Sequence, residues 1–217
     1  FADQRNYGLR KGNLSTDWVL HLDADERVTP SLRDELHRVA EEERYDAFRV
    51  PSKLMLHGRW LKHAGMYPTY QIRFGRRDAL TFKQVGHGQR GDLEENQIGT
   101  LSEPLLHHAF SKGLSHWFER HNRYATDEAR HAVDLISSSE ASWSDLLTGS
   151  PQQRRRALKD LSYRLPLRPL LRFLYVYVLK RGFLDGRAGF TYAKMLAVYE
   201  AMIDLKVREL RMKESEL

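Results

Sequence analysis

A short apolar segment that ends in a cluster of acids constrains the fold of this chain more than any other feature. Residues 18 to 26 have the sequence Trp-Val-Leu-His-Leu-Asp-Ala-Asp-Glu. The apolar residues predict a buried strand over residues 16–22 at the centre of a sheet, and Asp23 stands where that strand would leave the sheet. Ligands of open α/β sheets bind beyond the carboxyl ends of the strands. Asp23 and Asp25 could therefore hold Mg²⁺ or Mn²⁺ together with a substrate phosphate, or they could form only a solvated acidic turn.

The composition limits the class of protein. The chain has 217 residues, enough for one domain or a domain with an appendage, and its 41% apolar and 29% charged residues exclude a disordered protein. It contains no cysteine, which excludes a disulfide framework and thiolate chemistry and suits the cytosol. No signal peptide is visible, and no apolar run reaches the roughly 18–20 residues that a membrane-spanning helix needs.

Local patterns predict two helices around the acidic segment. Residues 2–11 are expected to form the first helix, which ends at Gly12. Thr29 is a favourable N-cap and Pro30 a favourable first residue for the second helix. The apolar face of that second helix is formed by Leu32, Leu36, Val39 and Ala40.

Alternating and apolar runs predict several strands. A strand over 45–50 is expected to stop at Pro51, and others are expected over 53–56 and 104–108. Tyr70, Ile72 and Phe74 alternate with polar residues, so residues 70–83 are predicted to form a hairpin around a turn at 75–78. Residues 86–100 carry several glycines and are predicted to form a loop.

The second half of the sequence predicts helices. A helix is expected after Ser111, a linker over 137–153, a short apolar segment over 170–179 and a long final helix over 190–212. The chain is therefore expected to be an α/β region followed by a C-terminal α-helical extension.

Five segments resemble, in the same order, family 2 glycosyltransferases with the GT-A fold. The segments are Ala-Asp-Gln-Arg-Asn-Tyr-Gly at 2–8, the Asp-X-Asp segment at 18–26, Leu-His-Gly-Arg-Trp at 56–60, Tyr-Gln-Ile-Arg-Phe at 70–74 and Leu-Leu-His-His at 105–108. The resemblance covers roughly residues 1–125. It is similar to bacterial transferases that build lipopolysaccharide core or other surface glycans. It implies a GT-A-type (Rossmann-like) mixed sheet that is incomplete at the N-terminus, because the family's nucleotide-binding strands come earlier.

The resemblance also implies a division of the chain and an activity. Residues 1–110 would form the catalytic region, 111–150 a helix and linker, and 151–217 a basic amphipathic helical tail. The activity would be transfer of a sugar, with inversion, from a nucleotide-sugar donor to a glycolipid, a lipid-linked glycan or a lipopolysaccharide-type acceptor. UDP-sugars are the favoured donors. The cofactor would be Mg²⁺ or Mn²⁺.

Roles at the metal and donor follow from the same resemblance. Asp25 would contact the metal directly, and Asp23 would help to hold the metal or the nucleotide ribose. His107 is favoured as a third metal ligand, although one of the neighbouring histidines could instead be a hydrogen-bonded strand residue. Arg5 and Asn6 match the helix that runs close to the donor nucleotide in the family.

Acceptor-binding residues are expected further along the chain. Trp60 could stack on a sugar ring and is expected to be more exposed than Tyr70, which could equally belong to the core. Arg73 could meet a phosphate or an acceptor carboxylate, or could be only a surface arginine. His87 is a further candidate for acceptor contact.

The candidates for the catalytic base lie in the glycine-containing loop predicted over residues 86–100. Relatives in this branch often carry a His-Glu pair after the hairpin, whereas this chain has His87 followed by Gly88. Glu94 is the first candidate for the displaced carboxylate and Asp92 the second, with Glu95 beside them. The alternative is that these acids are only solvated.

The net charge of +6 is concentrated in one segment. Residues 151–182 contain nine Lys and Arg residues and one acid. A basic segment with apolar residues predicts contact with an anionic membrane surface, and the alternative is ordinary helix packing. Nucleic acid is not expected as a partner, because no nucleic-acid-binding motif is present. The chain is expected to be cytoplasmic and peripheral at the inner face of the cell membrane.

Two classes of function therefore remain open from the sequence. The first is a metal-dependent glycosyltransferase. The second is a non-catalytic fragment or half-enzyme that binds an acceptor or a membrane without a complete nucleotide pocket.

Overall fold

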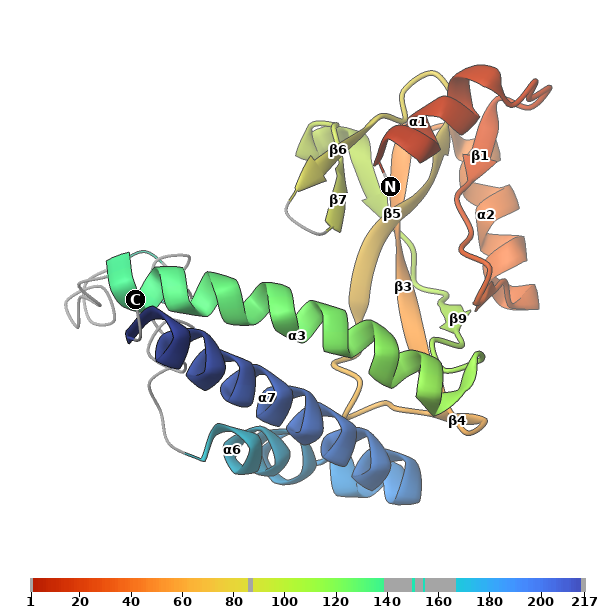
Figure 1. Cartoon of the computed structure of the whole chain (residues 1–217). Coiled ribbons are helices and arrows are strands. Elements are labelled where there is room, and N and C mark those ends of the chain that lie inside the picture. Colours follow the sequence, from red (N-terminus) through yellow and green to blue (C-terminus); the bar gives the residue numbers. More distant parts are fainter. Residues whose placement is uncertain (1, 86–87, 139–149, 151–153, 155–166, 216–217) are drawn as a thin grey trace. The chain divides into compact units, whose positions relative to one another are not determined.

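The computed structural model contains an α/β unit and a helical unit (Figure 1). It describes residues 2–85, 88–138, 150, 154 and 167–215. The units span Phe1–Ser111 and Lys112–Leu217. The division lies one residue from the boundary predicted at 110, whereas the boundary predicted at 150 falls inside the helical unit. The expected α/β class is confirmed, with helices following the sheet region.

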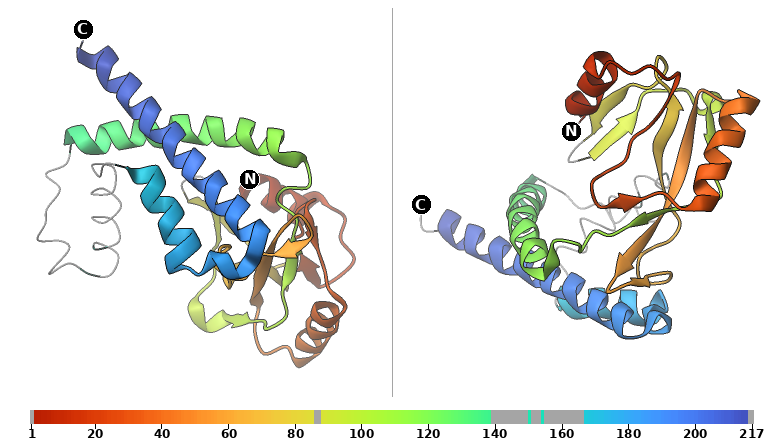
Figure 2. Two further views of the ribbon diagram at one scale, coloured as in Figure 1. Left: turned by 90° about the horizontal axis from the view of Figure 1, so that it is seen from below. Right: turned by 90° about the vertical axis from the view of Figure 1, so that its right-hand side faces the viewer.

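A mixed seven-stranded sheet forms the centre of the first unit. Its main order is β1 (Trp18–Leu20), β5 (Thr69–Arg76), β3 (Ala47–Leu56), β9 (Leu105–His107) and β2 (Glu26–Arg27). Two more strands pair with β3, namely β4 (Arg59–Trp60) and β8 (Ile98–Thr100). Strands β8 and β9 run parallel to β3, and the other pairs are antiparallel. The long strands β3 and β5 lie side by side in every view (Figure 2).

The segment before the acids is not the central strand that the sequence predicted. β1 has three residues and stands at one end of the sheet order, where it pairs antiparallel with β5. After Leu20 the chain leaves the regular ladder, with a last hydrogen bond from the His21 amide to the Arg73 carbonyl at 2.7 Å. Leu22 is exposed. Only the first three residues of the apolar run, Trp18 to Leu20, pair in the sheet and pack against the core.

Strand β3 continues through Pro51, so the predicted break there is wrong. Pro51 is buried and opposite Tyr70 on β5. On its other side β3 pairs with β8 up to Arg49 and with β9 from Ser52 onward. Proline cannot donate to a ladder. Its missing N–H falls in the gap between the two parallel partners, which is why an interior strand tolerates it.

A β-bulge on β5 changes which face its residues occupy. Phe48 is opposite Phe74 and Arg49 is opposite Ile72, so Arg73 is an extra residue without a partner in the register. Consequently Phe74 joins the core on one face of the sheet and Ile72 packs on the other. The predicted strand is confirmed, but its simple alternation is wrong, because a bulge re-aims the residues that follow it.

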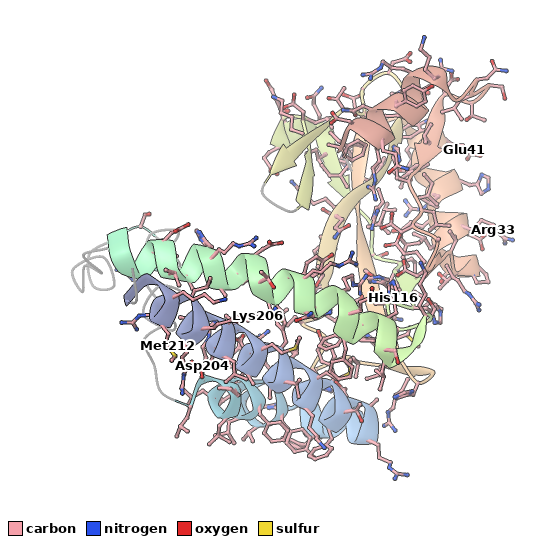
Figure 3. The ribbon with its side chains drawn as sticks, in the orientation of Figure 1. Arg33, Glu41, His116, Asp204, Lys206 and Met212 are labelled. Carbon is pink, nitrogen blue, oxygen red and sulfur yellow. The ribbon has the colours of Figure 1, made fainter. Side chains whose placement is uncertain are left out.

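Each face of the sheet is covered by a helix. Helix α2 (Pro30–Glu42) supplies Leu32 and Val39 to one core cluster. Thr29 accepts a hydrogen bond from the Leu32 amide at 3.1 Å, which confirms the predicted N-cap. The labelled side chains of Arg33 and Glu41 project from α2 away from the sheet (Figure 3). Helix α1 (Ala2–Lys11) packs on the opposite cluster, which is formed by Ala2, Ala47, Leu80 and Phe82.

The predicted hairpin over 70–83 is wrong, and so is most of the loop predicted after it. β6 (Phe82–Val85) pairs with β7 (Gly88–Gly91) in a separate two-stranded sheet, while β5 pairs with β1 and β3. A 3₁₀ turn, η1 (Glu95–Gln97), then leads into β8. The partner of a strand depends on contacts far along the chain, which local patterns do not contain.

The second unit is helical. It contains α3 (Gly113–Ser138), α6 (Arg168–Leu174), a π-helical turn η2 (Tyr175–Leu179), a 3₁₀ turn η3 (Gly182–Asp185) and α7 (Gly186–Ser215). Ala125, Ala129 and Ala132 of α3 pack on Ile203 and Val207 of α7. The small alanines allow a close approach of the two helices. Lys206, labelled in Figure 3, joins the helices by donating to Asn122 carbonyl at 3.2 Å. The predicted linker over 137–153 lies largely outside the described residues.

We predict that Gly99→Ala lowers the free energy of unfolding by about 1–3 kcal/mol, because extra volume in a filled site forces its neighbours apart. A Cβ on Gly99 would lie 2.6 Å from the Phe48 ring and 2.8 Å from Tyr45. Urea denaturation measures the change. Gly8→Ala in α1 is the control, because nothing lies within 4 Å of its Cβ position. It should raise stability by roughly 0.5–1 kcal/mol. An unchanged midpoint for Gly99→Ala would contradict the packing described.

Candidate functional site

Two arginines from distant parts of the chain hold Asp23. The Arg5 Nη2 atom of α1 donates to Asp23 Oδ1 at 2.9 Å, and the Arg73 Nη2 atom of β5 donates to Asp23 Oδ2 at 2.7 Å. The Asp23 side chain is still 48% exposed. One carboxylate therefore has a donor on each oxygen and a side open to a ligand.

A buried ion pair between Arg73 and Glu26 also holds residues 23–26 in place. Arg73 Nη2 donates to Glu26 Oε1 at 2.6 Å, and the two side chains are only 6% and 2% exposed. The second Glu26 oxygen accepts the Asp23 amide at 2.9 Å. The alternative of a surface arginine at position 73 is therefore wrong. The structure places Arg73, predicted to bind the acceptor, with the acids predicted to bind the donor.

The charges in this cluster shift the pKa values of its members. Burial acts to raise the pKa of Asp23, but the hydrogen bonds and charges of Arg73 and Arg5 outweigh it and lower that pKa below 3.8. Burial, followed by the charge of Arg73, lowers the pKa of Arg5. Burial and then the charges of Arg5 and Arg73 lower the pKa of His21 from 6.5 to about 4. His21 is thus neutral near pH 7, and its edge contacts the Phe82 ring with centroids 4.9 Å apart.

The pairing of β2 with β9 brings Asp25 and His107 together. Glu26 is opposite His107 in the register, and the His108 amide donates to the Asp25 carbonyl at 2.7 Å. As a result, His107 Nε2 lies 3.4 Å from Asp25 Oδ2, and both side chains are about one third exposed, at 34% and 30%. The Nε2 atom of His108 is instead buried, with no hydrogen-bond partner among the described residues.

A carboxylate and an imidazole are both suitable ligands for a divalent transition metal. Asp25 and His107 provide this pair, with no arginine bonded to either in the described ranges. Asp23, the other predicted ligand, is bonded to arginines instead. In the part of the chain that the structure describes, no three acids and histidines are grouped closely enough to hold a metal by themselves. A metal at Asp25 and His107 would therefore need further ligands from water or substrate.

The side chain of Asn6 makes structural hydrogen bonds to the backbone of Phe82. Its amide group donates to the Phe82 carbonyl at 2.8 Å and accepts from the Phe82 amide at 3.0 Å. This pair of bonds ties α1 to the start of β6. Arg5, the neighbouring residue, points to the acids. Of the two predicted donor residues in α1, Arg5 lies in the charged cluster and Asn6 holds the adjoining backbone.

The aromatic candidates for sugar contact differ from the expectation in their exposure. Trp60 is half-buried, with Lys53 Nζ 4.5 Å from its ring centroid and Tyr67 edge-on at 4.9 Å. Tyr70 is 45% exposed. The expectation that Trp60 is the more exposed residue and Tyr70 a core candidate is therefore wrong.

A cavity of about 200 Å³ lies beside Tyr70 and includes Arg5 in its wall. Its other polar residues are Gln71, Arg49 and Glu95, and the last two form an ion pair at 2.6 Å. Arg5 therefore lines the cavity with one part of its side chain and bonds to Asp23 through its guanidinium. Sequence reasoning missed Arg49, because nothing near it in the chain marks the face of β3 on which it lies.

A larger hollow of about 510 Å³ lies between α1 and the turn after β5. It is lined by Asn13, Arg77 and Asp78 among others, and it includes none of the acids of residues 23–26. The smaller cavity is therefore part of the candidate site, because it shares Arg5 with the charged cluster.

The candidates for the catalytic base have different surroundings. Asp92 forms an ion pair with Lys83 at 2.7 Å. Glu95 is paired with Arg49. Glu94 precedes η1 with an exposed side chain, and its amide donates to Gln97 at 3.1 Å. His87 lies outside the described residues.

We predict that Arg73→Met lowers the free energy of unfolding by about 3–5 kcal/mol, because it leaves Glu26 buried without its counter-charge. Glu26→Gln should also destabilise the chain, and the double variant should lose clearly less than the sum of the two. Chemical denaturation of the four proteins gives this coupling. Arg38→Met, which breaks the exposed pair with Glu42 at 2.8 Å, is the control and should cost less than about 1 kcal/mol. Additive losses at Arg73 and Glu26 would contradict the buried pair.

We predict that stability falls between pH 6.5 and 4 through His21. Its pKa is lowered on folding, so its contribution is present above the unfolded value of 6.5 and is lost as the pH falls toward 4. The loss should be about 1–2 kcal/mol, a reduced figure because the ring is partly exposed. His21→Phe keeps the ring contact and should flatten this part of the profile, whereas replacement of the exposed His37 should not. Asp23 contributes only at lower pH, from its ordinary 3.8 downward. A profile unchanged by His21→Phe would refute the assignment.

Comparisons with known proteins add no family to this description. No family model matches the chain, and no solved structure matches it either. What the structure establishes is the α/β class, the charged cluster around Asp23, and the proximity of Asp25 to His107.

Proposed function

We propose that this chain is a metal-dependent glycosyltransferase of the GT-A type. It would move a sugar, with inversion, from a nucleotide-sugar to a hydroxyl of a lipid-linked glycan or lipopolysaccharide-type acceptor. UDP-sugars are the favoured donors. The proposal depends mainly on one observation: Asp25 and His107 are 82 positions apart in the sequence, yet their side chains lie 3.4 Å apart.

Asp25 and His107 would hold Mn²⁺ or Mg²⁺, and the remaining ligands would be diphosphate oxygens and water, as is usual for these ions. The bound ion would neutralise charge that develops on the leaving nucleoside diphosphate. Both residues are partly exposed, so a substrate can reach them. His107 lies on β9 and Asp25 directly precedes β2, and the pairing of these two strands fixes their separation.

Asp23 would orient the ribose of the donor. Each of its oxygens already accepts an arginine hydrogen bond, and a carboxylate oxygen can accept a second one. Its low pKa keeps it ionised, and its exposed side can accept a hydroxyl. Arg5 and Arg73 would then act by holding this carboxylate in place, so Arg73 is a positioning residue in this scheme and not an acceptor ligand.

Glu94 would be the base that removes the proton from the acceptor hydroxyl. The carboxylates of Asp92 and Glu95 are engaged in ion pairs with Lys83 and Arg49. Glu94 has an exposed side chain for which no ion pair occurs among the described residues. The cavity beside Tyr70 would take the acceptor sugar, with the exposed aromatic ring against its apolar face. We place this reaction at the cytoplasmic face of a bacterial membrane, in the synthesis of a surface glycan.

We predict that the chain binds one nucleotide of a UDP-, GDP- and TDP-sugar panel in the presence of Mn²⁺ and loses that binding in EDTA. Asp25→Asn and His107→Gln should each weaken metal-dependent binding by roughly 100-fold or more, since even residues behind metal ligands cost 10–100-fold. Titration calorimetry measures the affinities, and release of the nucleoside diphosphate measures turnover. Asp34→Asn on α2 is the matched control and should change neither.

The outcome also separates the enzyme from a non-catalytic chain. Glu94→Gln should retain nucleotide binding but lower turnover by about 10²–10⁴-fold, the usual contribution of a general base. No nucleotide binding under any condition would refute the proposal and favour a chain that binds only the acceptor. Binding that persists fully in EDTA and in Asp25→Asn would refute the metal site.

A further inference from the structure

One face of the helical unit is apolar and exposed along three turns. Exposed apolar side chains recur at the helical spacing i, i+3, i+4, i+7, i+8 and i+11 from Leu167 through α6 and η2. This spacing is usual for a helix face that is buried in a core. Here these side chains are 39–70% exposed, and they are Leu167, Leu170, Leu171, Leu174, Tyr175 and Val178.

The same exposed surface continues into η3 and the start of α7. Leu179 is 74% exposed, and Phe183, Leu184 and Phe190 are each exposed by more than 40%. Rings link the segments, with Tyr177 5.4 Å from Phe190 and 6.3 Å from Phe183. We call the set from Leu167 to Phe190 the apolar face. Folding of the unit has left it facing outward instead of burying it.

All the exposed charged residues within residues 167–198 are positive. Residues 167–198 contain six Lys and Arg residues and one acid, Asp185, which is buried at 3% exposure. Lys180, Arg181, Arg187 and Lys194 are exposed. Lys180 lies 5.8 Å from the Tyr175 ring, so cationic groups stand directly beside the apolar face. Arg168 differs from these, because it is paired with Glu200 at 2.9 Å.

We propose that the apolar face binds the surface of an anionic lipid bilayer, lying in the interface between headgroups and acyl chains. Apolar side chains would enter the boundary of the acyl region, and Lys180, Arg181 and Arg187 would meet lipid phosphates. No described helix is long and apolar enough to cross a bilayer. A helix of this kind, with a wide apolar face beside basic residues, binds in the plane of the surface instead.

The charge favours a bilayer over a second copy of the chain. Two copies meeting through the apolar face would bring eight exposed cations together, four from each copy, with no exposed acid of residues 167–198 to oppose them. An anionic membrane supplies the opposite charge over the whole surface. The sequence pattern over 151–182 predicted such a partner. The structure moves the surface to 167–190, and most of 151–166 lies outside the described residues.

This inference goes beyond the proposed function and is tested without any nucleotide or sugar. The full chain is sedimented with vesicles of phosphatidylcholine alone and of phosphatidylcholine mixed equally with phosphatidylglycerol. We expect binding to the anionic vesicles, weak binding to the neutral ones, and loss of binding at high salt. Equal binding to both vesicle types, or binding to neither, would overturn the proposal.

Two pairs of variants identify the surface. Leu170→Glu with Leu174→Glu adds charge to the apolar face, and Lys180→Glu with Arg181→Glu reverses its cations. Each pair should weaken partitioning by about tenfold or more. The matched controls are Tyr7→Glu with Met66→Glu and Lys11→Glu with Arg33→Glu, which change exposed residues of the first unit. The controls should retain at least half of the binding.

Two further outcomes would overturn the proposal. Controls that lose as much binding as the test variants would show only a general effect of net charge. A dimer that light scattering detects without lipid, and that Leu170→Glu with Leu174→Glu dissolves, would show that a second copy occupies the face. Circular dichroism confirms that each variant is folded before its result is used.

Discussion

The buried guanidinium of Arg73 is the interaction on which the arrangement of the first unit's site depends. Its side chain bonds to both Asp23 and Glu26, and its carbonyl accepts the His21 amide. Residues 21–26 are thus attached to β5 at both the backbone and the side-chain level. Because Arg73 is also the bulge residue of β5, the irregularity in the strand and the geometry of the acidic segment have one origin.

The acids divide into two groups with different electrostatic surroundings. Asp23 and Glu26 are neutralised by Arg5 and Arg73 and have fixed positions. Asp25 is instead beside His107, a group that can bind a cation when neutral. A cation would therefore be drawn to Asp25, while Asp23 remains available to accept a hydroxyl. Neighbouring carboxylates in one short segment can thereby serve different purposes.

Local signals were enough to predict features that depend on nearby residues. Thr29 and Pro30 fix the start of α2 through a hydrogen bond three residues away, and the alternation around Ile72 marks a strand. They were not enough where the outcome depends on distant partners. Pro51 stays in a strand because β8 and β9 leave a gap opposite it, and Ile72 and Phe74 occupy different faces because the pairing of β5 with β3 contains a bulge.

The site shows the same limit. The sequence marked Asp23, Asp25 and His107 as a set through resemblance, but only the β2–β9 pairing brings Asp25 to His107. The role of Arg73 depended on burial, which a single arginine in an alternating strand does not reveal. Arg49 and its pairing with Glu95 were missed because this pairing joins positions 46 residues apart. The basic region was visible from composition, and the structure adds which apolar side chains face outward beside it.

The most direct test of the proposed site is pulsed electron paramagnetic resonance of Mn²⁺ bound to the chain in the presence of a nucleoside diphosphate. The Asp25 and His107 site predicts a hyperfine coupling from a directly coordinated nitrogen, which should disappear in His107→Gln while the protein remains folded. Bound Mn²⁺ without a nitrogen coupling, or a coupling that survives in His107→Gln, would contradict the account.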